Sequence, residues 1–106
     1  MDWTRARDRN LVRWRRILAG IGVDDPPELL RRLNEVGEVC ELAREDAGGA
    51  QGRCDHCLVF GSAGECLDLR WKITRALLEA ELDEARSLVR GVVARTLAAR
   101  PAGDDR

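Results

Sequence analysis

Four cysteines carry the clearest chemical pattern in this sequence. Cys54 and Cys57 are separated by two residues, eight residues lie between Cys57 and Cys66, and thirteen lie between Cys40 and Cys54. The two-residue spacing lets a pair of thiolates face one ion while backbone amides turn toward the sulfurs. Four thiolates satisfy the tetrahedral preference of zinc. We therefore predict that Cys40, Cys54, Cys57 and Cys66 bind one metal ion.

A different feature of the sequence supports each of the four predicted ligands. Cys54 and Cys57 stand in a glycine-rich stretch where little else explains a cysteine pair. Cys66 is expected at the start of a helix, where free amides and the helix dipole stabilise a thiolate. Cys40 lies on the apolar side of a predicted helix and would serve equally well as a buried core cysteine. We expect His56, the only histidine, to be an exposed loop residue and not a ligand.

Zinc is the metal that such a site favours, because it needs no special assembly. An iron–sulfur cluster also takes four cysteines, although the spacing matches neither ferredoxin pattern. Thiol–disulfide exchange and unmetallated cysteines remain alternatives. A closed four-thiolate zinc site leaves no position for a substrate, so its role is structural. The sequence contains no Ser/His/Asp set and no phosphate-binding glycine loop, and we expect a protein that is not an enzyme.

The composition suits one small helical domain. The chain has 106 residues, of which 44% are hydrophobic and 35% charged, and its formal net charge is −1. We predict a single metal-binding domain over residues 1–100 and a flexible tail over residues 101–106. No apolar run is long enough to cross a bilayer, and arginines interrupt any signal-peptide pattern. We therefore expect a cytoplasmic protein, in a compartment that keeps thiols reduced.

Hydrophobic periodicity predicts an all-α fold, a small three-helix bundle. The helices are expected from Trp3 to Ala19, from Pro27 to Asp46 and from Cys66 to Ala99. Between the second and third helices, Ala47 to Gly64 reads as a long loop that the metal pins to both neighbours. The apolar stripes of the first two helices comprise Trp3, Leu11, Trp14, Ile17 and Leu18, then Leu29, Leu33, Val36, Cys40 and Ala43.

The predicted C-terminal helix carries more apolar surface than two shorter helices easily cover. Its stripe comprises Leu78, Leu82, Ala85, Val89, Val92 and Thr96, and four further apolar residues widen it, Ile73, Leu77, Leu88 and Val93. We expect a homodimer or another protein partner to bury the surplus through this long helix. The sequence thus favours a non-catalytic interaction or accessory protein, part of a homodimer or a larger complex.

Charge is unevenly spread along the chain. Residues 1–22 hold six arginines against two acids, whereas residues 23–46 hold eight acids against three arginines. Arg5, Arg9, Arg13 and Arg16 share one side of the first helix, and guanidinium groups bind phosphates and carboxylates well. The ridge could contact nucleic acid, as in a small regulator, or an acidic protein surface. It could equally be a solvated face that pairs with the acidic second helix.

Overall fold

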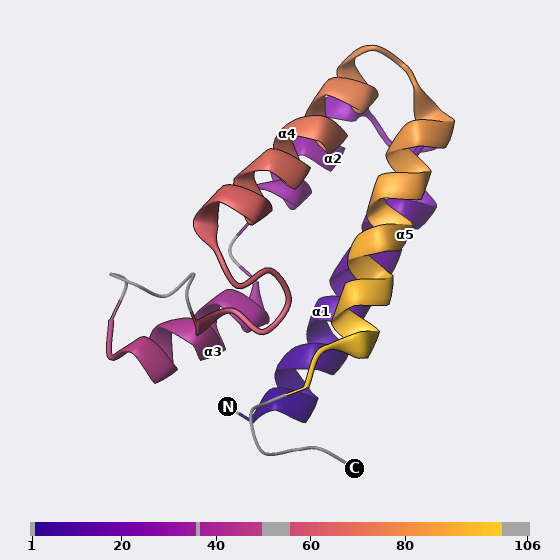
Figure 1. Ribbon diagram of the computed structural model, residues 1–106. Helices are drawn as coiled ribbons and strands as arrows, with labels where there is room; N and C mark the ends of the chain where they lie inside the picture. The colour runs from indigo at the N-terminus through magenta and orange to yellow at the C-terminus, as the bar shows by residue number, and fades with distance from the viewer. Residues whose placement is uncertain (1, 36, 50–55, 101–106) are drawn as a thin grey trace.

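The structure is a computed structural model that describes residues 2–35, 37–49 and 56–100 (Figure 1). Within those ranges it contains helices and no strand, so the all-α prediction is confirmed. The five helices are α1 (Trp3–Gly20), α2 (Pro26–Leu33), α3 (Glu38–Ala47), α4 (Ala63–Leu78) and α5 (Leu82–Ala98). None of them is long and apolar enough to span a bilayer. The predicted tail lies outside the described residues.

The expected three-helix bundle is therefore wrong in its helix count, and the first difference lies in the second predicted helix. The chain leaves the helix after Leu33 and enters another at Glu38. At the break, the Asn34 side chain donates to the carbonyl oxygen of Leu30 at 2.8 Å, and Gly37 is the extended N-cap of α3. The break lets α2 and α3 pack separately, α2 against α1 and α4, and α3 against α1.

The second difference divides the predicted long C-terminal helix into α4 and α5. The two helices form an antiparallel hairpin with a tight turn at residues 79–81 (Figure 1). The hairpin buries both apolar sides at once: Ile73, Ala76 and Leu77 of α4 join Ala85, Val89 and Val92 of α5 in one core cluster. A straight helix would have left one of these sides in water, which explains why the chain turns.

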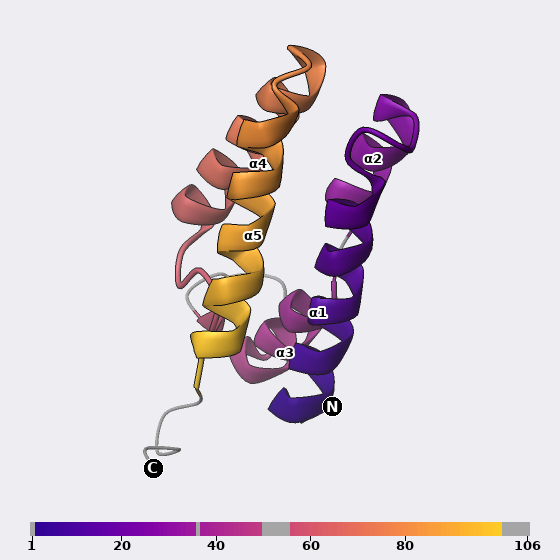
Figure 2. The same ribbon diagram turned by 90° about the vertical axis from the view of Figure 1, so that its right-hand side faces the viewer.

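Four of the helices form a closed ring around the core. α1 contacts α5, α5 contacts α4, α4 contacts α2, and α2 returns to α1. Figure 2 shows α1 and α5 running antiparallel, with α3 against the lower half of α1. The remainder of the core cluster comes from Trp14, Ile17, Ile21, Leu29 and Leu33.

Burial confirms much of the predicted periodicity and corrects the predicted docking surface. Leu11, Trp14, Ile17, Leu29, Leu33 and Ala43 are buried, and Val36 lies outside the described residues. Ala85, Val89, Val92 and Thr96 are completely buried by the other helices. The stripe of α5 is therefore part of the core of one chain and does not need a partner to cover it.

Candidate metal centre

Three of the predicted ligands line one small cavity between α1, α3 and α4. Cys40 comes from α3, Cys57 from the turn before α4, and Cys66 from the first half of α4; the cavity holds about 40 Å³. All three side chains are half-buried. The other lining residues are mostly apolar, and they are Asn10, Arg13, Trp14, Leu33, Glu35, Gly37, Val39, Ala43, Val59, Phe60, Ser62 and Arg70. Cysteines separated by up to 26 residues thus share one enclosure.

Cys57 is positioned by a turn that is anchored to the core. The Gly61 amide donates to the Cys57 carbonyl oxygen at 2.9 Å, and Gly61 has a φ of 75°, which glycine adopts without strain. Val59 is buried, and Phe60 packs against the core cluster. These contacts by themselves fix the turn from Cys57 to Gly61 against the core.

Arg95 of α5 contacts this turn twice and α4 once. Its Nε donates to the Val59 carbonyl oxygen at 3.2 Å, and its Nη2 pairs with Glu65 at 2.9 Å. Its guanidinium also lies 5.1 Å from the centroid of the Phe60 ring, a cation–π contact. Sequence reasoning missed Arg95, because these contacts reach across 30 and 36 residues and no local spacing signals them.

Cys66 and Cys40 are fixed by their helices. The Ser62 hydroxyl caps α4 by accepting from the Glu65 amide at 3.2 Å, and the Cys66 amide donates to the Ser62 carbonyl oxygen at 3.3 Å. Cys66 therefore lies at the positive end of the α4 dipole, as predicted. On α3, Cys40 follows buried Val39 and precedes buried Ala43, and both bury their side chains where α3 packs against α1.

The cavity is electrostatically suited to negative sulfur. Arg13 and Arg70 both line it, against the single carboxylate of Glu35. Arg13 donates to the Glu35 carbonyl oxygen at 2.9 Å, and the buried Nε of Arg70 has no partner among the described residues. These positive side chains would offset the negative charge of metal-bound thiolates. Neither arginine could have been assigned to the cysteines from spacing alone.

The donor chemistry fits a thiolate metal site, but the described residues do not complete one. No three His, Cys, Asp or Glu side chains within residues 2–35, 37–49 and 56–100 are arranged to hold an ion. Cys54 lies outside those ranges, in the segment between α3 and Cys57. His56 is exposed, in line with its expected place as a loop residue. The metal-pinned loop is thus not part of the structure described.

A second feature is a broad groove between α1 and α2, here called the arginine groove. Its cavity volume is about 900 Å³, and its walls are Arg9, Val12, Arg13, Arg16, Ile17, Ala19, Gly20, Asp24, Arg31, Arg32 and Glu35. Three members of the predicted ridge line it, whereas Arg5 does not. The groove adds two arginines of α2 to those of α1, a convergence that a one-helix pattern could not predict.

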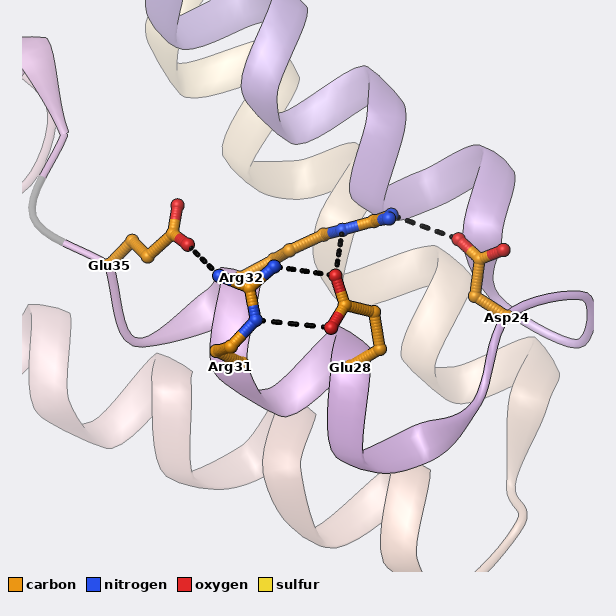
Figure 3. A network of polar contacts seen from close by, with 5 residues as sticks. All are labelled: Asp24, Glu28, Arg31, Arg32 and Glu35. Carbon is orange, nitrogen blue, oxygen red and sulfur yellow. Dashed lines mark hydrogen bonds and ion pairs between the residues drawn. The ribbon is translucent and has the colours of Figure 1, made fainter.

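The acidic side chains in and beside α2 form ion pairs with the two arginines of α2 (Figure 3). Glu28 accepts from Arg31 at 2.6 Å and from Arg32 at 3.3 Å, and Asp24 accepts from Arg32 at 2.9 Å. The hydrogen bond from Arg31 is the main cause that holds the pKa of Glu28 below its ordinary value. Arg13 of the predicted ridge donates to the backbone carbonyl oxygen of Glu35, just after α2, which is a hydrogen bond and not the predicted pairing with an acidic side chain.

Comparison with known proteins supplies no relative for this site. No family model, no curated protein and no solved structure matches the chain.

Proposed function

We propose that this chain is a non-catalytic helical interaction protein that binds one structural zinc ion through Cys40, Cys54, Cys57 and Cys66. The observation that carries the proposal is the shared cavity, which gathers Cys40, Cys57 and Cys66 from three separate segments. Cys54 precedes Cys57 by three positions, and the two-residue spacing makes it the proposed fourth ligand.

Zinc suits the surroundings of this cavity. Four thiolates around a divalent ion carry net negative charge, which Arg13 and Arg70 offset. The bound ion would link α3, the turn after Cys57 and α4, which are otherwise joined through a segment of 15 residues from Gly48 to Ser62. The free energy of binding would then add to that of folding. We place the protein in the cytoplasm, where reduced thiols remain available for the metal.

Metal analysis of the native protein, purified without air, tests this proposal. We expect one zinc per chain, no visible absorbance, and loss of the metal on treatment with a strong chelator. Iron with acid-labile sulfide and visible absorbance would instead establish the iron–sulfur alternative. Protein that holds no stoichiometric metal, or that forms a disulfide among these cysteines under reducing conditions, would contradict a metal centre of either kind.

A second candidate function is binding of an anionic partner such as nucleic acid. The arginine groove favours it, since five guanidinium groups line the groove against two carboxylates. Arginine-lined surfaces bind phosphates through charge and bidentate hydrogen bonds, and salt weakens such binding strongly. Titration with duplex DNA at two salt concentrations tests it: specific binding at physiological salt supports a regulator, and no binding leaves the groove as a solvated face.

The interaction role rests on exposed apolar surface. Among the described residues, six large hydrophobic side chains are exposed, and three of them belong to α4. We propose that the protein works as a homodimer or within a larger complex, and that α4 replaces the core stripe of α5 as the contact surface.

A further inference from the structure

Three large apolar residues and one threonine form a stripe along one side of α4, here called the α4 seam: Leu67, Trp71, Thr74 and Leu78. They are spaced by four, three and four residues. At about 100° per residue, this spacing confines them to an arc of roughly 60°. Leu67, Trp71 and Leu78 are 65%, 64% and 65% exposed, and Thr74 is half-buried.

The seam is distinct from the side of α4 that builds the core. Ile73, Ala76 and Leu77 of the same helix are at most 5% exposed. The other exposed large hydrophobics are Val12, Val23 and Leu97, which belong to α1, the turn after it and α5. The described surface therefore gathers large apolar side chains along one helix only, and the chain itself leaves them uncovered.

Charges beside the seam identify what would cover it. Asp68 and Arg75 lie on the same edge of the seam, because they fall about 60° and 40° from Trp71 in the same sense. Each side chain stays exposed, Asp68 at 61% and Arg75 at 66%, although each also has a partner one turn away on α4. Nearest the seam, this edge thus carries Asp68 toward the N-terminus of α4 and Arg75 toward its C-terminus, while their partners Lys72 and Glu79 lie farther around the helix.

The seam is self-complementary in size in an antiparallel pair of α4 helices. When two copies meet about a two-fold axis between Trp71 and Thr74, each Trp71 lies beside the Thr74 position of the other copy, and Leu67 lies beside the Leu78 position. The small threonine leaves room for the indole ring, and its methyl group offers that ring an apolar contact. Large side chains that alternate with small ones let two helix surfaces interdigitate.

The charges are self-complementary in the same arrangement. The same edges of the two helices face each other, as in antiparallel coiled coils. Asp68 of one copy then falls within about two residues of the Arg75 position of the other copy, and symmetry repeats the pair. A parallel pair would instead place the Asp68 and Arg75 edges of the two copies on opposite sides of the contact, so it would not form these charge pairs.

We propose that two copies of this chain associate through the α4 seam as an antiparallel, two-fold symmetric dimer. The inference deepens the interaction role proposed above and rests on that role, but it does not depend on the metal. The arrangement leaves the cysteine cavity as described, since Cys66 does not belong to the seam.

Sedimentation of the full chain, with its metal and across a range of concentrations, tests the proposal by charge exchange. We expect Asp68→Arg and Arg75→Asp each to raise the dimer dissociation constant about tenfold, since each creates two repulsive pairs. The double variant Asp68→Arg/Arg75→Asp restores opposite charges across the seam. It should bind within about threefold of the original chain.

Two controls complete this experiment. Trp71→Ala should give a monomer with an unchanged circular dichroism spectrum, because Trp71 is largely exposed in the single chain. Asp83→Arg, a charge reversal at a fully exposed residue of α5, should leave the dimer intact. Because the charge variants lie on the surface, circular dichroism also shows whether each one folds.

The outcomes separate this inference from the proposed metal centre. If the original chain sediments as a monomer at every concentration, the proposed dimer is wrong. It is also wrong if the double variant associates no better than the single ones. If the chain does not dimerise in this way but still binds one metal ion, only the dimer proposal fails. If the chain dimerises by the pattern above but binds no metal, the seam holds and the metal centre fails.

Discussion

Ala80 takes an unusual backbone conformation for a residue with a side chain, with a φ of 56°. It terminates α4: its amide donates to the Leu77 carbonyl oxygen at 3.3 Å, and the Glu81 amide donates to the Ala76 carbonyl oxygen at 2.8 Å. These two bonds are the Schellman pattern, in which glycine is the usual left-handed residue. The side chain of Ala80 therefore costs free energy where a glycine would not.

We predict that Ala80→Gly stabilises the fold by about 1 kcal/mol, because it relieves left-handed strain that exceeds the added entropy of the unfolded chain. Urea denaturation measures the change. The matched control is Glu79→Gly, at a φ of −88°, which should lower stability because glycine relieves no strain there. Equal destabilisation by both substitutions would show that the turn is built differently.

Asn10 and Thr96 form a buried polar contact that joins α1 to α5. The Asn10 amide donates to the Thr96 hydroxyl at 3.1 Å, and that hydroxyl donates to the Val92 carbonyl oxygen at 2.8 Å. Asn10 is 6% exposed and Thr96 is fully buried. Because Asn10 is buried, its amide depends on the Thr96 hydroxyl for this hydrogen bond.

We predict that Thr96→Val lowers the free energy of unfolding by about 1–3 kcal/mol, because it leaves the Asn10 amide buried without an acceptor. Asn10→Ala combined with Thr96→Val removes both polar groups. The double variant should lose less stability than the two single losses added together. Denaturant unfolding of the three variants gives the coupling, and strict additivity would contradict the contact.

At the scale of elements, α5 supports the cysteine cavity through Arg95 and the turn after Cys57. We predict that Arg95→Met weakens zinc binding by about tenfold, because it removes the hydrogen bond and ion pair that tie α5 to the turn and to α4 but leaves all the ligands in place. Competition with a chromophoric zinc chelator measures the affinity. Arg90→Met, an exposed arginine of the same helix, is the control and should bind zinc like the original chain.

The ion pairs of α2 make a pH-dependent contribution to the stability of the fold. The pKa of Glu28 lies below its ordinary value of 4.5 in the folded chain, so the unfolded chain binds protons more tightly at that site. Its stabilising contribution is complete above the ordinary pKa and is lost as the pH falls through the lowered one.

We therefore predict that Glu28→Gln reduces the free energy of unfolding at neutral pH and that its difference from the original chain shrinks in acid. Denaturation at a series of pH values below neutrality checks this. A constant difference across the series would mean that Glu28 acts through packing and not through its charge.

At the scale of the whole molecule, periodicity predicted helix and burial better than it predicted connectivity. Leu29, Leu33 and Ala43 keep their spacing and are all buried, although the helix that was to carry them is broken. The turn at Ala80 contains neither Gly nor Pro, the residues that usually signal a turn in a sequence. Only the packing of α4 against α5 explains it, and that packing is a property of the tertiary structure.

The candidate site could likewise be predicted only in part from the sequence. Its cysteines could be singled out because their spacing is a local signal, and three of the four line one cavity, but their binding of a metal stays a prediction. Arg13, Arg70 and Arg95 could not be predicted as its neighbours, because helix packing brings them there from distant positions. The predicted stripe of the C-terminal segment is largely core where it runs along α5, since periodicity alone does not say which of two stripes the chain itself covers.

Titration of the metal-free protein with cobalt(II) tests the four-thiolate centre most directly, because tetrahedral cobalt absorbs visibly and its thiolate charge-transfer band grows with each sulfur ligand. We predict a 1:1 end point with the intensity of four thiolates, displacement of cobalt by zinc, and loss of one thiolate contribution in Cys40→Ser, Cys54→Ser, Cys57→Ser and Cys66→Ser alike. A Cys40→Ser variant with the unchanged spectrum would contradict the centre as proposed, as would the absence of a tetrahedral cobalt spectrum in the original chain.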